Sequence, residues 1–315
     1  MTAARGRALV TPEAATTVAP AATVILLRES DDGGGRLEVL LTQRAAGLSF
    51  MGGLWVFPGG RMEPADLAPA ITAHATAASV ASLRARMLDL DGQPLDAERA
   101  LGLCVAACRE TFEESGVLLA RRRPRGNRLE RSDATPTGLA GDDALRAAAT
   151  SAQAFVDLLL TQDLELELDR LVYWAHWITP SMERKRFDTR FFAVQVPPGQ
   201  EASVDRSELT QHAWLDEQSI DARMAAGEMR MAPPTIATLQ DLWRSHARHG
   251  GLARMLEAER TREVPPILPK LRRLEDGVEV LLPWDREYAS AEGEACVPCE
   301  RCPDYLAALP SRRRF

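Results

Sequence analysis

A helix with three carboxylates on one face is the feature that most constrains this chain. The apolar spacing of residues 97–115 predicts that helix, and Gly116 predicts its end. Residues three and four apart are neighbours on a helix, so three acidic side chains of the last turns share one face. They are Glu110, Glu113 and Glu114. Because like charges at this spacing destabilise a bare helix, the face suits a bound divalent cation; a solvated acidic face is the alternative.

The opposite side of the predicted helix is apolar. Its side chains recur at helical spacing and lie about 180° from the carboxylates. They are Leu101, Cys104, Val105, Cys108 and Phe112. We therefore expect this side of the helix to pack into the core while the acidic side remains available to a ligand.

The rest of the chain predicts an α/β fold of the α+β kind. Strands at residues 22–28 and 37–42 flank a glycine-rich turn and form a hairpin. Further strands are expected at 171–178, 187–196 and 213–215, and a hairpin near Asp276 and Gly277. Further helices are expected at 67–95, 144–160, 216–227 and 234–248. Strands at both ends with helices between them indicate helices that cover a mixed sheet.

The segment around the acidic helix resembles the signature of the Nudix hydrolases. That signature, the Nudix box, reads G-x5-E-x7-R-E-U-x-E-E-x-G-U, where U is aliphatic. The first half is matched by Gly60, with Asp66 in place of the glutamate, and Thr111 replaces the first aliphatic residue of the second half. The second half is matched by Arg109, Glu110, Glu113, Glu114, Gly116 and Val117.

The spacer inside the box is the main departure from the family. Residues 67–108 stand where the pattern has seven residues. An interrupted box resembles one subgroup, the coenzyme A diphosphatases of mammalian peroxisomes and their bacterial relatives. The runs Leu-Leu-Thr-Gln-Arg at 40–44 and Val-Phe-Pro-Gly-Gly at 56–60 are also similar. The resemblance covers about residues 20–245 and implies the Nudix fold, a mixed sheet sandwiched between helices, with a helical insertion inside the box.

The resemblance implies one enlarged domain rather than two catalytic ones. The Nudix domain is expected at residues 21–250, with insertions at 67–103 and 121–150. We expect residues 1–20 to be a disordered leader and residues 251–315 to be a proline-rich C-terminal extension. The role of the first insertion is open: a lid, a dimer contact or decoration.

The resemblance also implies a chemistry, the hydrolysis of a nucleoside diphosphate linked to another group, with Mg²⁺ or Mn²⁺ as the cofactor. The implied metal ligands are Glu110, Glu113 and Glu114, with the carbonyl of Gly60 as a further one. Arg109 would orient the glutamates by charge-assisted hydrogen bonds, and Asp66 would lie behind them. The general base varies within the family; Glu208 is the candidate here, and a surface glutamate is the alternative.

Coenzyme A or an acyl-CoA is the substrate that the subgroup implies, cleaved to 3′,5′-ADP and (acyl-)phosphopantetheine. A nucleotide sugar, a dinucleotide or a nucleoside triphosphate is the alternative for an enzyme. A ligand sensor without catalysis is the alternative of another class, although such sensors typically lose glutamates of the box. Arg44 and Arg61 are candidates for phosphate contacts, followed by Arg186 and Arg190. The arginine-rich stretch 121–131 either binds a polyanion or is a solvated loop.

Overall charge favours a small-molecule partner. With 38 basic and 45 acidic residues the net charge is −7, which disfavours nucleic acid. No apolar run approaches the roughly 20 residues of a membrane helix, and no signal-peptide core is seen. The five cysteines do not resemble a secreted disulfide framework, so we predict the cytoplasm. A homodimer is left open.

Three of the cysteines form a C-x2-C-x2-C run near the C-terminus. Cys296, Cys299 and Cys302 have a spacing that suits zinc or an iron–sulfur cluster, but three ligands are one short of a full set. Unliganded cysteines in a tail are the alternative.

Overall fold

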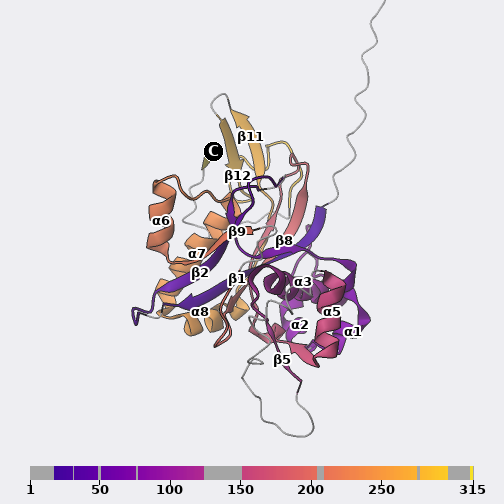
Figure 1. Ribbon diagram of the computed structural model, residues 1–315. Helices are drawn as coiled ribbons and strands as arrows, with labels where there is room; N and C mark the ends of the chain where they lie inside the picture. Colours follow the sequence, from indigo (N-terminus) through magenta and orange to yellow (C-terminus); the bar gives the residue numbers. More distant parts are fainter. Residues whose placement is uncertain are drawn as a thin grey trace, which may run out of the picture.

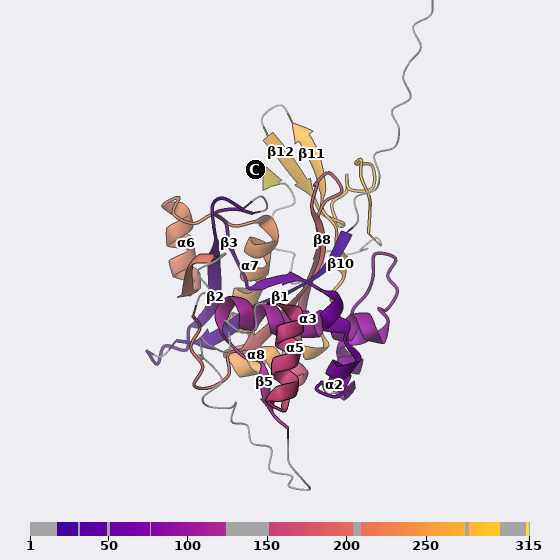
Figure 2. The same cartoon turned by 45° about the vertical axis from the view of Figure 1, so that its right-hand side comes forward.

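The computed structural model describes residues 18–30, 32–48, 51–75, 77–123, 151–203, 209–274, 277–296 and 313–314. Within these ranges, no helix combines the length and the apolar character that crossing a membrane requires. The described residues form a mixed sheet with helices on both sides, seen in two views in Figures 1 and 2. The expected fold class is confirmed.

The main sheet has eight strands among the described residues. Its central strand, β1 (Val18–Glu29), runs parallel to β8 (Arg186–Gln195) and antiparallel to β2 (Leu37–Arg44). The order is β10-β7-β8-β1-β2-β3, with β4 paired to β1 and β9 paired to β2. The other five strands are β3 (Trp55–Val56), β4 (Gly59–Arg61), β7 (Val172–Ile178), β9 (Leu209–Leu215) and β10 (Pro266–Ile267).

The first hairpin is confirmed, with Leu27 opposite Val39. Strand β1 begins earlier than expected, because Val18 already pairs with Arg186 of β8. The last three residues of the expected leader therefore belong to the sheet. Residues 1–17 lie outside the described part of the chain.

Along one edge, strand β1 pairs first with β4 and then with β2, and this places Gly59 and Gly60. Its first half pairs with β4, where Ala22 is opposite Gly60. A Cβ on Gly59 would lie 2.5 Å from the carbonyl oxygen of Ala22 and 2.7 Å from the Cα of Thr23. Only glycine permits so close an approach of two backbones.

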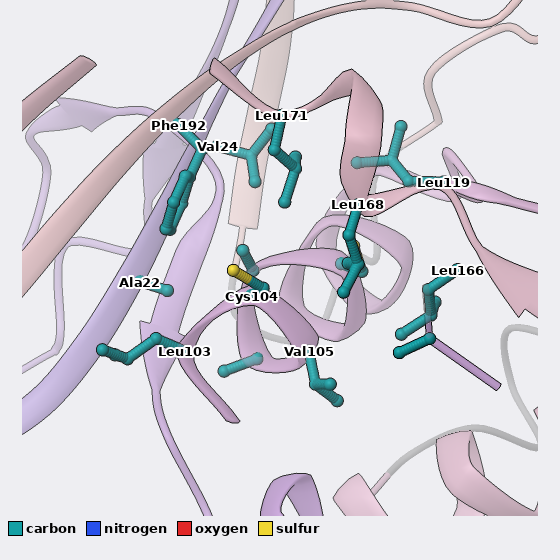
Figure 3. Packing of buried hydrophobic residues seen from close by; sticks show 14 of the residues in the cluster. Ala22, Val24, Leu103, Cys104, Val105, Leu119, Leu166, Leu168, Leu171 and Phe192 are labelled. Carbon is teal, nitrogen blue, oxygen red and sulfur yellow. The ribbon is translucent and has the colours of Figure 1, made fainter. Parts of the chain in front are cut away.

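Helices cover the two faces of the sheet and enclose two cores. Alternate residues of a strand point to opposite faces, so Val24 enters one core and Ile25 the other. The first core lies under α1 (Pro69–Thr72), α2 (Ala77–Arg84), α3 (Ala97–Ser115) and α5 (Ala152–Thr161). The second lies under α6 (Glu217–Ala225), α7 (Pro233–His249) and α8 (Leu252–Ala258). Figure 3 shows Cys104 and Val105 of α3 among side chains of the first core, such as Val24 and Phe192.

Helix α3 is the predicted acidic helix. The side chain of Asp96 accepts a hydrogen bond from the backbone N–H of Arg99 and caps the start, and Gly116 ends the helix with a φ of 69°. Of its predicted apolar face, Cys104, Val105, Cys108 and Phe112 are buried and Leu101 is half-buried. The prediction of one buried side and one acidic side is confirmed.

The insertion inside the box is helical only in part. The continuous helix expected over residues 67–95 is wrong. The chain instead forms the 3₁₀-helix η1 (Pro64–Leu67), the short α1 and α2, and an irregular stretch in which Leu88 bridges Pro94. Pro69 opens a new helix and Gly92, at a φ of 76°, makes a turn, so local backbone preferences break the pattern.

Of the second insertion, expected at residues 121–150, only residues 121–123 are described. Strand β5 (Ala120–Arg122) pairs with β6 (Leu164–Leu166), followed by the 3₁₀-helix η2 (Leu168–Arg170). Helix α5 corresponds to the later part of the helix expected at 144–160. Residues 124–150 lie outside the described residues.

The described residues of the expected C-terminal extension pack against the main sheet or form a small sheet of their own. Strand β10 pairs with β7, and α8 packs into the second core. After α8 come the 3₁₀-helix η3 (Glu259–Thr261) and a small sheet of β11 (Lys270–Leu274), β12 (Gly277–Leu281) and β13 (Arg313–Arg314). Leu274 is opposite Gly277, so the hairpin expected there is confirmed.

Candidate active site

Arg109 is the centre of a cluster of carboxylates. Its side chain is only 2% exposed. The Nε and Nη2 groups donate to the two oxygens of Asp66 at 2.9 and 3.0 Å. Nη1 donates to Glu110 at 2.8 Å and to Glu113 at 3.0 Å, and Nη2 donates to the carbonyl of Arg61 at 2.8 Å. Arg109 thus contacts two of the glutamates that it is expected to orient.

Asp66 joins the two halves of the interrupted box. It is fully buried, and its Oδ2 also accepts the backbone N–H of Glu63 at 2.8 Å. The pairing with Arg109 is bidentate, which fixes the orientation of both groups. The two halves of the box therefore meet in space although the insertion separates them in sequence.

Gly60 of the box and the preceding Gly59 lie directly against two of the glutamates. The backbone N–H of Gly59 donates to Oε2 of Glu114 at 2.9 Å. A Cβ on Gly60 would overlap the carboxylate of Glu110. An alanine at position 60 would therefore require the Glu110 carboxylate to shift.

Negative charge is in excess around Arg109. Its guanidinium faces three carboxylates, of which Glu110 is 15% and Glu113 21% exposed. Burial raises the pKa of Glu110, and it raises the pKa of Glu113 to about 7, although the charge of Arg109 acts in the opposite direction. An added cation would relieve this imbalance.

The donor atoms fit a hard divalent cation by their chemistry. Oε1 of Glu113 is buried and has no hydrogen-bond partner in the described part of the chain, and carboxylate oxygens are the ligands that Mg²⁺ prefers. The carboxylates of Glu110, Glu113 and Glu114 do not converge on one point in this structure. Across the described ranges, no three His, Cys, Asp or Glu side chains are grouped so that they could hold a metal ion. Glu110 and Glu113 are turned to Arg109 and Glu114 to Gly59, so binding would require these side chains to rotate.

The two leading candidates for phosphate contacts differ in burial. Arg61 is exposed on β4, next to Gly60. Arg44 is half-buried at the end of β2, and its Nε is buried without a partner among the described residues. An incompletely paired, half-buried cation is suited to an anionic ligand.

The two weaker candidates have carboxylate partners of their own. Arg190 is fully buried, pairs with Asp188 at 2.5 Å and donates to the carbonyl of Leu88 at 2.7 Å. Arg186 pairs with Glu294 at 2.6 Å. Arg190 is therefore not accessible to a substrate, which corrects its inclusion as a phosphate candidate.

Asp188 is the centre of a second buried cluster, which sequence reasoning missed. Its carboxylate lies 2.5 Å from Nε2 of His176 and 3.6 Å from Nη2 of Arg99, in addition to Arg190. Burial lowers the pKa of His176 to about 4. Burial would raise the pKa of Asp188, but His176 and Arg190 hold it well below its usual range. The signals in the sequence were His176 in the aromatic stretch of β7 and Arg190, which was considered only as a phosphate contact.

The expected general base, most of the cysteine run and most of the arginine-rich stretch lie outside the described residues. Glu208, Cys299 and Cys302 are not among the described residues. The thiol of Cys296 is buried, 3.4 Å from the carbonyl oxygen of Pro266. In the arginine-rich stretch, Arg121 lies 3.6 Å from Glu165 and Arg123 lies 3.8 Å from Asp163, while residues 124–131 are not described.

The fold and the Arg109 cluster define a class of protein, the Nudix hydrolases. A solved structure of this class is similar to the chain. A crystal structure of a NUDIX hydrolase from Alicyclobacillus acidocaldarius superposes with a TM-score of 0.56 and 26% sequence identity. The match covers 73% of this chain and 92% of that one. Within this class, a family profile described as the NUDT19 Nudix domain matches residues 12–242, and the chain belongs to that family.

Two curated relatives carry the same description, acyl-coenzyme A diphosphatase NUDT19. The protein from Gallus gallus is 29% identical over 228 residues, which are 62% of this chain and 58% of the relative. The protein from Homo sapiens is 28% identical over 290 residues, which are 80% of this chain and 72% of the relative. The match to the chicken protein thus spans less than two thirds of that relative's length.

Proposed function

We propose that this protein is a Mg²⁺- or Mn²⁺-dependent diphosphatase that cleaves coenzyme A or an acyl-CoA. The observation that carries the proposal is the Arg109 cluster, in which the box glutamates are all present and negative charge is in excess. The description of the chicken and human relatives as acyl-coenzyme A diphosphatases supports the choice of substrate.

Each residue of the cluster has a distinct part in the proposed reaction. Glu110, Glu113 and Glu114 provide carboxylate oxygens, and the carbonyl of Gly60 is a further ligand. Arg109 orients Glu110 and Glu113, while Asp66 holds Arg109 in place. A bound divalent cation would neutralise the diphosphate and lower the pKa of an attacking water.

The attacking water forms a new bond to one phosphorus as the bond from that phosphorus to the bridging oxygen breaks. The products are 3′,5′-ADP and (acyl-)phosphopantetheine. Arg44 and Arg61 are the proposed partners of the phosphates. Glu208 is the proposed general base. It directly precedes Leu209 of β9, which pairs with Arg44 of β2.

A substrate panel tests the proposal. Coenzyme A, acyl-CoA, ADP-ribose, NADH, diadenosine polyphosphates and dNTPs are each incubated with the protein and Mg²⁺, with and without a chelator, and the products are separated by chromatography. We expect chelator-sensitive release of 3′,5′-ADP from coenzyme A or acyl-CoA. Hydrolysis of another compound alone would refute the proposed substrate, and binding without any hydrolysis would indicate a ligand sensor.

The substitution Arg44→Ala tests the phosphate contact. Loss of one charge-assisted hydrogen bond should raise the KM for coenzyme A by about tenfold or more, with little change in kcat. Arg248→Ala, which removes an exposed arginine of α7, is the matched control. An unchanged KM in Arg44→Ala would remove Arg44 from the site.

The cytoplasmic location, a possible homodimer and a metal at the C-terminal cysteines stay predictions of the sequence. Fractionation of cells and gel filtration of the purified protein test the first two. Metal analysis with and without residues 290–315 tests the third.

A further inference from the structure

The chain directly after α3 lacks regular secondary structure and yet is buried. Gly116 ends the helix, and Val117, Leu118 and Leu119 are each at most 1% exposed. Buried backbone groups outside helices and strands need other hydrogen-bond partners. The question for this segment is which groups satisfy Leu118.

The side chain of Gln200 satisfies both backbone groups of Leu118. The N–H of Leu118 donates to Oε1 of Gln200 at 2.8 Å, and Nε2 of Gln200 donates to the carbonyl of Leu118 at 2.9 Å. Gln200 is itself only 9% exposed. Its amide thus pairs with the Leu118 backbone as a neighbouring strand would, which requires one donor and one acceptor in the same side chain.

A second contact connects the same segment to the helix itself. The backbone N–H of Ser203 donates to the carbonyl of Ser115, the last residue of α3, at 2.8 Å. Residues 200–203 therefore hold both the end of α3 and the chain that follows it. Glu113 and Glu114, which immediately precede Ser115, stand on the turn held in this way.

We propose that Gln200 is a positioning residue for the carboxylates at the end of α3. The inference rests on the proposed function, because it assigns to Gln200 the placement of Glu113 and Glu114 toward the cation. Gln200 acts through its two hydrogen bonds to the backbone of Leu118. Residues that hold metal ligands in place typically change metal affinity by about 10- to 100-fold when they are replaced.

The test compares Gln200→Leu with Gln195→Leu. Both substitutions replace an amide by an apolar side chain of similar size, but Gln195 is exposed at the end of β8. In the metal-free protein, Gln200→Leu should accelerate amide hydrogen exchange across residues 112–120, whereas Gln195→Leu should not. In calorimetric titrations with Mn²⁺, the Kd of Gln200→Leu should rise about tenfold. At saturating Mn²⁺ its KM for coenzyme A should stay within about twofold of the wild type.

The outcomes separate positioning from general destabilisation and from failure of the proposed function. A folded Gln200→Leu variant with an unchanged Kd for Mn²⁺ would overturn the inference alone. If the wild type binds no Mn²⁺, the proposed function is wrong and the inference is wrong with it. Should Gln200→Leu fail to fold, Gln200→Glu retains the acceptor for the Leu118 N–H and removes the donor. A folded Gln200→Glu variant with wild-type affinity for Mn²⁺ would equally overturn the inference.

Discussion

Helix α3 enters two buried ionic clusters, one near each end, and the two have opposite charge balance. Near its start, Arg99 joins the cluster of Asp188, in which one carboxylate faces two arginines and a histidine. Near its end, Arg109 faces three carboxylates. Arginines outnumber carboxylates in the first cluster, and carboxylates outnumber arginines in the second.

The pKa values of Asp188 and Glu113 shift in opposite directions in the two clusters. Burial acts to raise the pKa of Asp188, but the hydrogen bond from His176 and the charge of Arg190 hold it low, so this carboxylate stays ionised. Burial raises the pKa of Glu113 to about 7, because a single guanidinium does not compensate the neighbouring negative charge. The Asp188 cluster is suited to a fixed anchor, whereas the Arg109 cluster is suited to an added cation.

The largest effect is expected from Glu113→Gln. The amide keeps an oxygen that can accept from Arg109 but loses the charge that would bind the cation, so turnover with Mg²⁺ should fall by at least about 100-fold. The melting temperature should stay near that of the wild type. Full activity in this variant would show that the cluster is not the metal site.

The Asp188 cluster should respond in the opposite way. Asp188→Asn leaves two arginines without their carboxylate, and removing one partner from a buried pair costs about 3–5 kcal/mol of stability. Urea unfolding measures this loss, with Asp221→Asn on the exposed side of α6 as the control. Affinity of the folded variant for Mn²⁺ should be unchanged; a parallel loss of affinity would mean that the clusters are not independent.

Gly60→Ala adds a methyl group where the Glu110 carboxylate lies. Overpacking of this kind costs about 1–3 kcal/mol, and the displaced carboxylate should also weaken Mn²⁺ binding. Gly47→Ala is the matched control, because a Cβ on Gly47 has nothing within 4 Å. Equal stability and equal affinity in the two variants would contradict the close contact between Gly60 and Glu110.

The smallest expected difference between the two clusters is how stability and Mn²⁺ affinity change with pH. The folded-state pKa of Glu113 is raised to about 7 from 4.5, so its contribution to the stability of the metal-free protein is present below about pH 4.5 and lost as the pH rises through 7. Mn²⁺ must displace this proton, so its affinity should rise by up to about tenfold per pH unit below pH 7 and level off above it. Calorimetry in several buffers measures the slope, and a flat profile would refute the raised pKa.

His176 in the other cluster should show the reverse dependence. Its pKa is lowered to about 4 from 6.5, so the stability it contributes is present above about pH 6.5 and lost as the pH falls through 4. Replacing His176 by glutamine should remove that part of the acid sensitivity in urea unfolding. An unchanged acid profile would show that His176 does not titrate in this way.

Helical spacing predicted the part of the Arg109 cluster that lies on α3, the family resemblance implied Asp66, and neither indicated the Asp188 cluster. Arg109, Glu110 and Glu113 lie within one helix, so their proximity follows from helical spacing, and the first hairpin follows from its turn residues. The Asp188 cluster depends on the register of β7 on β8 and on the insertion, and the pairing of Gln200 with Leu118 spans 82 residues. For the same reason the sequence did not show that β10 joins the main sheet.

Titration of the metal-free protein with Mn²⁺ tests the central claim most directly, because it compares the two clusters in one measurement. We predict saturable binding to the wild type and to folded Asp188→Asn, and loss of that binding in Glu113→Gln. Equal binding by the wild type and by Glu113→Gln, or no binding by the wild type, would contradict the assignment of the Arg109 cluster as the site of the cation.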